Sequence, residues 1–236
     1  MRRMLMVASI ALACLVPARA GSKDAWTTEF PVSKADLSST GRNPYFVLEP
    51  GHYLVLRGGG EELKFTVLDE TLKVDGVETR VVQEYETNQG ALTEISRNYY
   101  AVNRKTGDLY YFGEEVDMYR DGRVFSHGGS WRSGIRNAKF GMMMPGKPAA
   151  GFRHYQEQAP GVAMDRAEIV STKATIQTPA GTFSNCVNVA ESTPMSKGAF
   201  EHKYYAQGVG LIKYERLELV DYGKGGVSAL HKASSQ

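Results

Sequence analysis

Three consecutive methionines, Met142, Met143 and Met144, are the residues of this sequence that most directly suggest metal chemistry. Histidines stand on either side of them along the chain, His127 before and His154 after. Thioether and imidazole ligands together suit Cu(I). One alternative is therefore a copper-binding protein that uses these five residues. Methionine also fills irregular apolar gaps, so plain packing of the three side chains is the competing interpretation.

Two carboxylates could act together in hydrolysis. Glu157 and Asp165 flank the turn Ala159-Pro160-Gly161, and a hairpin there would bring them near each other. Glycoside hydrolases work with such a pair, so a hydrolase that uses Glu157 and Asp165 is a second alternative. The sequence contains no G-x-S-x-G, H-E-x-x-H or C-x-x-C motif. We therefore assign no catalytic residue and no cofactor, and expect a binding protein rather than an enzyme.

Tyrosines come in neighbouring pairs at 99–100, 110–111 and 204–205. Neighbours on a strand point to opposite faces, so each pair is expected to send one ring to each face of a sheet. Aromatic walls with few charges suit a cavity for an apolar ligand, although core packing explains the same rings. The predicted ligand-binding residues are Trp131, Met142, Met143, Met144, His154, Tyr155 and Tyr205.

The elements that would position these residues are strands. Turn sequences such as Asp75-Gly76 and Asp121-Gly122 separate runs rich in Val, Ile, Thr, Tyr and Phe, which is typical of successive antiparallel hairpins. We predict an all-β fold, a single antiparallel meander of about ten strands curled into a barrel or half-barrel, with little helix. The predicted strands are 52–58, 61–74, 77–87, 91–103, 108–120, 123–131, 152–158, 162–178, 183–192 and 200–220.

Strand pairing can be predicted at two turns. Asp75-Gly76 should pair Val74 with Val77 and Leu72 with Thr79. The apolar residues stand at odd positions up to Val67 and at even positions from Leu72. This change of face predicts a bulge between the two residues.

At Asp121-Gly122 the expected pairs are Tyr119 with Val124 and Met118 with Phe125. Both faces of that hairpin then carry an aromatic ring, so the sheet should be covered on both sides or enclose something.

The remaining segments are less regular. Residues 132–150 are expected to form a long connection without strand character, and residues 33–39 a short helical turn with Ser33 as its N-cap. We divide the chain into a signal peptide (1–20), an N-terminal linker (21–42), a β-rich domain (43–222) and a flexible tail (223–236).

The first twenty residues have the features of an export signal. Arg2 and Arg3 precede an apolar run, and Ala18-Arg19-Ala20 resembles a cleavage site. The run is shorter than the roughly 20 residues that span a membrane. We expect a periplasmic or secreted protein without a transmembrane span. Attachment of lipid at Cys14 is the less favoured alternative, because Ala11 and Leu12 fit poorly before it.

Charge and cysteine content narrow the class further. Without the three arginines of residues 1–20, the 28 basic residues fall to 25, against 26 acidic residues. Such a balance gives no reason to expect nucleic acid as a partner. Cys186 is then the one remaining cysteine, so folding needs no internal disulfide, and we expect it to be a small buried apolar residue.

Several segments, read in order, resemble an uncharacterised family of exported bacterial β-rich proteins. They are "NPYFVLEPG" (43–51), "YYFGEEV" (110–116), "GSWRSG" (129–134), "MMPGKP" (143–148), "YQEQAPGVAMDRAEIVS" (155–171), "TPAGTFSNC" (178–186) and "EHKYYAQGVGLIK" (201–213). The resemblance covers roughly residues 43 to 215 and implies no reaction. Its general character is similar to periplasmic half-barrels that hold lipids or lipoproteins, which is an analogy of fold alone.

The sequence departs from this family at two places. Arg132 follows Gly-Ser-Trp where relatives tend to have an acidic residue, and the methionines stand where relatives tend to have Ile-Ile-Met. The second departure implies a need for apolar side chains rather than for sulfur. We therefore expect a binding or envelope-maintenance module for an apolar small molecule, a lipid or an envelope protein.

Overall fold

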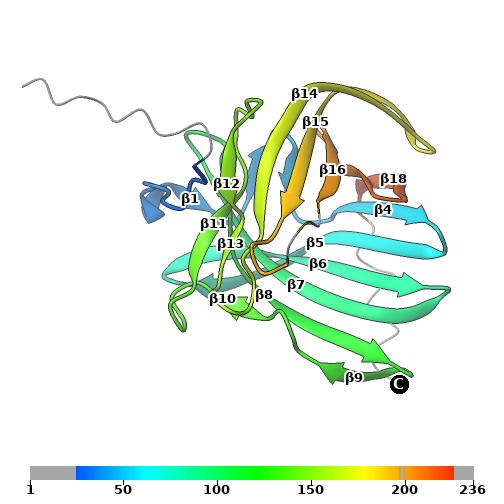
Figure 1. The fold of residues 1–236 in the computed structure, drawn as a ribbon, viewed down its shortest axis with the longest axis horizontal. Coiled ribbons are helices and arrows are strands. Elements are labelled where there is room, and N and C mark those ends of the chain that lie inside the picture. Colours follow the sequence, from blue (N-terminus) through cyan, green and yellow to red (C-terminus); the bar gives the residue numbers. More distant parts are fainter. Residues whose placement is uncertain (1–24, 197, 199, 226–236) are drawn as a thin grey trace, which may run out of the picture.

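The computed structural model describes residues 25–196, 198 and 200–225. These residues form one large antiparallel sheet that is nearly closed into a barrel, together with a small two-stranded sheet (Figure 1). Within the described residues, the helical content is a single 3-10 turn, η1 (Lys34–Asp36). The predicted all-β class is confirmed, with more strands than the ten expected.

The strands are β1 (Leu37–Ser38), β2 (Gly41–Asn43), β3 (Phe46–Leu48), β4 (His52–Gly58), β5 (Glu61–Val74), β6 (Val77–Asn88), β7 (Ala91–Asn103), β8 (Leu109–Arg120), β9 (Arg123–Ser126), β10 (Trp131–Arg132), β11 (Lys139–Met144), β12 (Arg153–Tyr155), β13 (Glu157–Gln158), β14 (Arg166–Thr178), β15 (Gly181–Ser192), β16 (Glu201–Ala206), β17 (Gly210–Tyr214) and β18 (Leu217–Lys224). Three of the predicted strands, 123–131, 152–158 and 200–220, are divided into shorter ones.

The order of strands in the large sheet explains its near closure. It runs β12-β14-β15-β16-β17-β18-β4-β5-β6-β7-β8-β11-β13. At the two ends of this order, β12 pairs with β14 through His154 and Ala167, and β13 pairs with β11 through Glu157 and Phe140. Gln156 alone separates β12 from β13, so one short segment contacts both ends of the sheet.

The turn at Asp75-Gly76 has the predicted register. Val74 pairs with Val77 and Leu72 with Thr79, and the pairing shifts between Val67 and Thr71 where a bulge was expected. Asp75 and Gly76 have φ values of 48° and 79°. Positive φ at both central residues is what a type I′ hairpin turn requires.

Two predictions about strands are wrong. Residues 132–150 contain β11, which pairs with β8 through Gly141 and Tyr111; its glycine and methionines lack the β-branched residues that usually mark a strand. The pair of Met118 with Phe125 is also wrong. Tyr119 does face Val124, but a register shift then pairs Met118 with Ser126, because a bulge inserts one extra residue.

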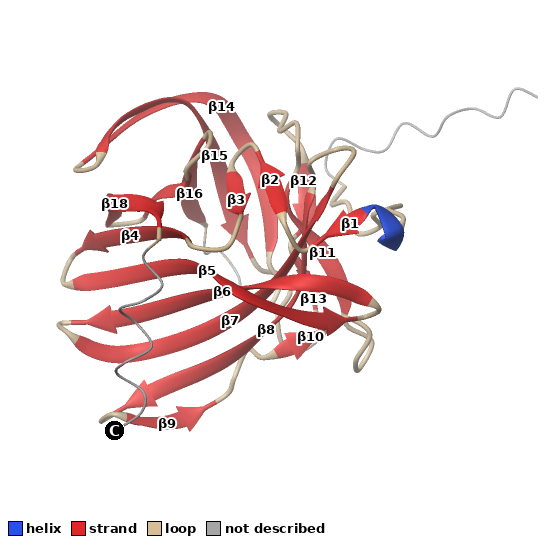
Figure 2. Ribbon diagram, turned by 180° about the vertical axis from the view of Figure 1, so that it is seen from behind, coloured by secondary structure: helices blue, strands red, loops and turns tan. Residues whose placement is uncertain are grey.

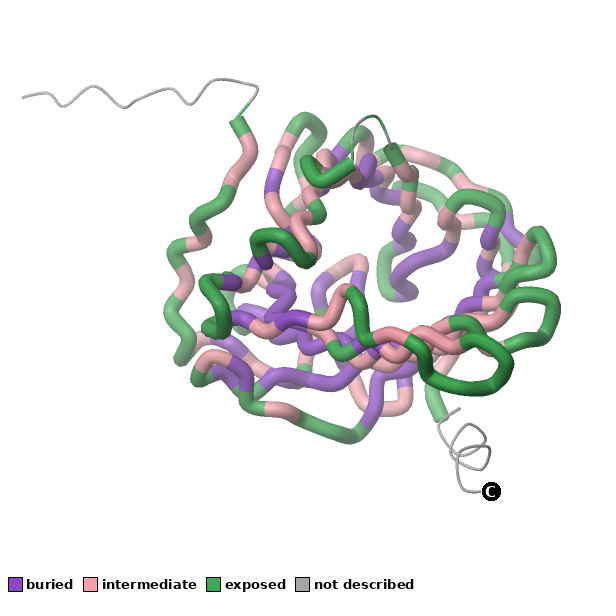
Figure 3. Tube along the Cα trace, turned by 60° about the horizontal axis from the view of Figure 1, so that its bottom comes forward, coloured by how far each residue is buried: buried purple, intermediate pink, exposed green. Residues whose placement is uncertain are grey.

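Both faces of the sheet carry apolar side chains, as the sequence predicted. The inner cluster contains Tyr100 and Tyr111, whereas the outer cluster contains Tyr99 and Tyr110. Each of these tyrosine pairs is thus split between the faces. Buried segments run along the strands and exposed ones gather at the turns (Figure 3).

The N-terminal segment covers part of the outer face. Phe30 packs edge-on against Tyr110, with ring centroids 6.0 Å apart, and Thr27 forms an isolated bridge with His154. β1 pairs with β7 through Leu37 and Asn103, and the helical turn η1 directly precedes β1 (Figure 2). Ser33 precedes η1 without a side-chain capping bond.

Other predictions fall outside the described residues. The signal peptide and most of the predicted tail lie there, although β18 continues to Lys224. In the part of the chain that the structure describes, no helix is long and apolar enough to cross a membrane. Cys186 is free and fully buried, as expected of a small apolar core residue.

Candidate functional site

A cavity of about 170 Å³ lies inside the curved sheet. Its lining comes from strands that are far apart in the sequence, chiefly β3 to β7 on one side and β11, β16 and β17 on the other. Curvature of the sheet brings these strands to face one another. The cavity has one apolar region and one acidic region.

Aromatic and aliphatic side chains form the apolar region. Phe46 packs against Phe65 with ring centroids 5.3 Å apart, and against Tyr100 at 5.0 Å. Leu54 and Leu211 add aliphatic surface. Successive side chains of a strand point to opposite faces. Every second residue of β4 and β5 therefore points into the cavity, and these inward residues form the apolar region.

Glutamates of β6 form the acidic region. Glu84 and Glu86 line the cavity, and they follow Val82 at spacings of two residues, so all three share the inner face. Across the neighbouring strand, Glu86 lies directly opposite Glu94 and Glu84 opposite Ser96. Like charges placed directly opposite each other destabilise a sheet.

Burial shifts the pKa of these carboxyls upward. Desolvation, with a smaller contribution from Glu86, raises the pKa of Glu84 to about 8. Desolvation and Glu86 raise the pKa of Glu94 to about 7, and desolvation also raises the pKa of Glu114 to about 7. The side chain of Glu84 keeps part of its surface exposed because its carboxyl faces the cavity. Protein atoms nevertheless surround that carboxyl, which explains its desolvation. Near neutral pH these groups are partly protonated.

Lys203 lies on the opposite side of the cavity. Its Nζ is 2.6 Å from Oε2 of Glu191, whose other oxygen accepts a hydrogen bond of 3.0 Å from Gln156. Burial alone would lower the pKa of Lys203, but Glu191 and other neighbours outweigh burial and raise the pKa well above its ordinary value. Lys203 is therefore a permanent cation that is already paired.

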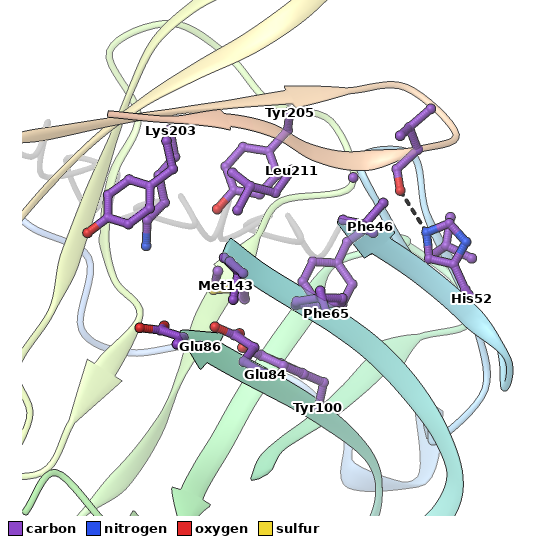
Figure 4. Close-up of a pocket in the computed structure, with 16 residues that line it drawn as sticks. Phe46, His52, Phe65, Glu84, Glu86, Tyr100, Met143, Lys203, Tyr205 and Leu211 are labelled. Atoms are coloured by element: carbon purple, nitrogen blue, oxygen red, sulfur yellow. Dashed lines mark hydrogen bonds between the residues drawn. The ribbon is translucent and has the colours of Figure 1, made fainter. Parts of the chain in front are cut away.

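Two buried tyrosines present hydroxyls to the same region. Tyr205 is 2% exposed and Tyr100 is 3% exposed, and both line the cavity. Among the described residues, neither hydroxyl forms a hydrogen bond. Figure 4 shows the Tyr205 hydroxyl directed toward the side that carries Glu84 and Glu86. Burial raises the pKa of both phenols, so they remain protonated donors.

The structure places two of the seven predicted ligand-binding residues, Met143 and Tyr205, on the cavity wall. Trp131 packs edge-on against Tyr111 at 5.5 Å and lines a separate hollow of about 370 Å³. Tyr155 stands edge-on to Trp26, with ring centroids 6.3 Å apart.

The three methionines point in different directions. Met142 belongs to the outer cluster, Met144 to the inner core, and Met143 faces the cavity. His154 is fully buried and stacks on Phe152; burial lowers its pKa to about 4, although nearby carbonyls favour the charged ring.

His127 is exposed, and its Nδ1 lies 2.8 Å from Asp117. No group of three His, Cys, Asp or Glu residues in the described chain is arranged to hold a metal ion. The three methionines belong to different surroundings, so their thioethers are not gathered on one face. The copper alternative stays a prediction.

Glu157 and Asp165 do come together across their hairpin. The backbone N–H of Glu157 donates to the carbonyl of Asp165 at 3.0 Å. Desolvation raises the pKa of both carboxyls, strongly for the buried Glu157. An acid and base pair needs environments that push the two pKa values apart. The upward shift is larger for Glu157 than for Asp165, so the two pKa values differ. The hydrolase alternative stays a prediction.

Sequence reasoning missed Glu84, Glu86 and Glu94. In β6, Val77 and Val81 belong to the outer cluster, whereas Val82 belongs to the inner one. Val82 was the residue that could have revealed these glutamates. Val82, Glu84 and Glu86 are two residues apart, so they share one face of the strand, and this second face is apolar at one end and acidic at the other.

Comparison with known proteins adds no assignment. No protein-family model, no curated protein and no solved structure gives a significant match to this chain.

Proposed function

We propose that this protein is an exported binding module that holds a small, mainly apolar ligand inside its barrel. The observation that carries the proposal is the cavity of about 170 Å³ with its aromatic and aliphatic walls. Apolar cavities of about 150 Å³ accept a benzene-sized molecule. A ligand with one ring or a short alkyl chain would therefore fill the space.

The acidic region supports a functional interpretation. Buried carboxyls with raised pKa values weaken a fold, and such groups concentrate at functional sites. Glu86 and Glu94 face each other directly, which a purely structural sheet would avoid. The residues Arg2, Arg3 and Ala18-Arg19-Ala20 support export, so the ligand would be met in the periplasm or outside the cell.

The test uses variants that fill the cavity. Leu211→Trp places an indole in the apolar region, and Leu63→Phe is a milder version at another wall position. Val124→Trp adds the same indole at a side chain that is 41% exposed on β9 and serves as the matched control. Protein purified from its own source is examined by native mass spectrometry, and binding of an environment-sensitive apolar dye is measured by fluorescence.

We expect a bound small molecule or saturable dye binding in the wild type and in Val124→Trp. Both should be lost in the two cavity-filling variants, while circular dichroism stays unchanged. Wild-type protein that is always empty and ignores apolar probes would refute the proposal. Dye binding that survives both fillings would place the ligand elsewhere.

A further inference from the structure

We propose that the ligand carries a positively charged amine, which binds between Glu84, Glu86 and the hydroxyl of Tyr205. This inference rests on the proposed function and names the chemical class of the ligand. Three independent features support it: the unbalanced charge of the cavity, the unpartnered tyrosine hydroxyls, and the acidic surface next to the cavity.

The charges on the cavity wall do not balance. Among the described residues that line it, Glu84 and Glu86 are acidic and Lys203 is basic, and Lys203 is 2.6 Å from a different carboxylate, that of Glu191. Within the described chain, Glu84 receives one hydrogen bond, a long one of 3.4 Å from Asn98. Lys203 favours the charged form of both carboxyls from across the cavity, but within the described residues neither carboxyl forms the salt bridge that buried acids normally have.

The neutral polar groups match an ammonium. Tyr205 and Tyr100 are buried residues of the cavity wall, and among the described residues their hydroxyls, which are open to the cavity, form no hydrogen bond. An ammonium has three donor hydrogens and no acceptor. Two carboxylates and one hydroxyl oxygen can accept all three (Figure 4).

The rest of the ligand is organic. No trio of His, Cys, Asp or Glu in the described chain could hold a metal ion, so a bare divalent cation is not favoured. The apolar region around Phe46 and Phe65 calls for a ring or an alkyl chain attached to the amine. The cavity volume limits that body to about the size of one ring.

A second hollow adjoins the cavity and shares Glu86, Leu63 and Tyr214 with it. Its wall also carries Glu61 and Glu62; Glu62 is paired with Arg57 and Lys64. Acidic surface concentrates cations and repels anions near a cavity. A fatty acid or another carboxylate would therefore be disfavoured.

The groups that face Glu84 determine how binding depends on pH. They are Glu86 on its own strand, Glu94, Ser96, Asn98 and Tyr100 on β7, Glu114 on β8, and Lys203 and Tyr205 on β16. Without ligand, Glu84 holds a proton up to about pH 8. An amine has to displace that proton, so amine binding should tighten as the pH rises.

The experiment compares three probes with one carbon skeleton: benzylamine, benzyl alcohol and benzoate. Their affinities for the full chain are measured by calorimetry at about pH 6 and about pH 8. The first value lies below the raised pKa of Glu84, and the second lies close to it. We expect benzylamine to bind at least about tenfold more tightly than benzyl alcohol at the higher pH, with benzoate weakest. Benzylamine alone should gain affinity with pH and release protons.

Glu84→Gln keeps the shape and removes the charge. We expect it to weaken benzylamine by about tenfold or more and to leave benzyl alcohol unchanged, whereas Glu115→Gln, on the outer face, should change neither. Glu86→Gln repeats the test should Glu84→Gln not fold. Benzyl alcohol that binds as tightly as benzylamine would overturn this inference and leave the proposed function standing. Failure of all three probes together with failure of the apolar dye would overturn both.

Discussion

Glu84 shows how one side chain can serve a site at the expense of the fold. Its carboxyl is surrounded by protein, and its pKa is raised to about 8. A group whose pKa is higher in the folded state than in the unfolded state lowers stability once the unfolded chain releases its proton. In the absence of a ligand, Glu84 therefore destabilises the barrel near neutral pH.

Replacing Glu84 with glutamine should stabilise the protein. At about pH 8 we expect Glu84→Gln to raise the free energy of unfolding by roughly 1–3 kcal/mol, the usual range for relieving an unsatisfied buried group. Urea denaturation of wild type, Glu84→Gln and the outer-face control Glu115→Gln provides the measurement. A loss of stability in Glu84→Gln would show that the carboxylate has a favourable partner.

The functional residues could be predicted only in part. Met143 and Tyr205 were named from the sequence because methionine and tyrosine are conspicuous there. The inward glutamates were not, because an acidic residue on a strand is ordinarily solvated. Recognising them requires knowing that the sheet curves around the side that bears Val82.

Among the elements, β10 depends on one glycine of β8. Gly113 has a φ of 138° and pairs with Arg132. A Cβ atom there would lie 2.3 Å from the carbonyl oxygen of Trp131, closer than real Cβ contacts allow. The absence of a side chain lets β10 approach β8 and places Trp131 against Tyr111.

Gly113→Ala should displace β10. Gly122→Ala is the matched control, because Gly122 also has a positive φ, 71°, but its added Cβ would meet no atom within 4 Å. We expect Gly113→Ala to cost about 1–3 kcal/mol more than the control, the range for forcing extra atoms into a packed site. Thermal denaturation and tryptophan fluorescence measure this. Equal losses would assign the whole effect to backbone strain.

Hairpins were the elements best predicted from the sequence. The bounds of β5 and β7 and the register at Asp75-Gly76 follow from turn residues and alternation, which are local properties. β11 was missed because its pairing with β8 spans more than twenty residues and its composition gives no strand signal. Which strands would close the sheet was likewise beyond local patterns.

For the whole molecule, the buried carboxyls predict an unusual dependence of stability on pH. The folded pKa is about 8 for Glu84 and about 7 for Glu94 and Glu114, against about 4.3 in an unfolded chain. Between these values the folded state retains protons that the unfolded state has released, so stability falls as pH rises. His52 and His154, whose pKa values burial lowers, oppose this trend below about pH 6.5.

We therefore expect the urea midpoint to fall between about pH 6.5 and about pH 8.5, where unfolded histidines no longer take up protons. Glu84→Gln should flatten this decline. Denaturation series across the range, with and without benzylamine, measure it, and a bound amine should restore stability at the upper end. A midpoint that stays constant or rises would contradict the burial of these acids.

The pairing of β4 with β18 has a consequence for how the chain is made. Leu56 of β4 lies opposite Leu219 of β18, so β4 can pair along this edge only after a segment much later in the chain has been synthesised. Pairings this distant in sequence slow folding. A chain emerging from the ribosome would leave one edge of β4 unpaired until β18 has been synthesised, so the sheet cannot close before then.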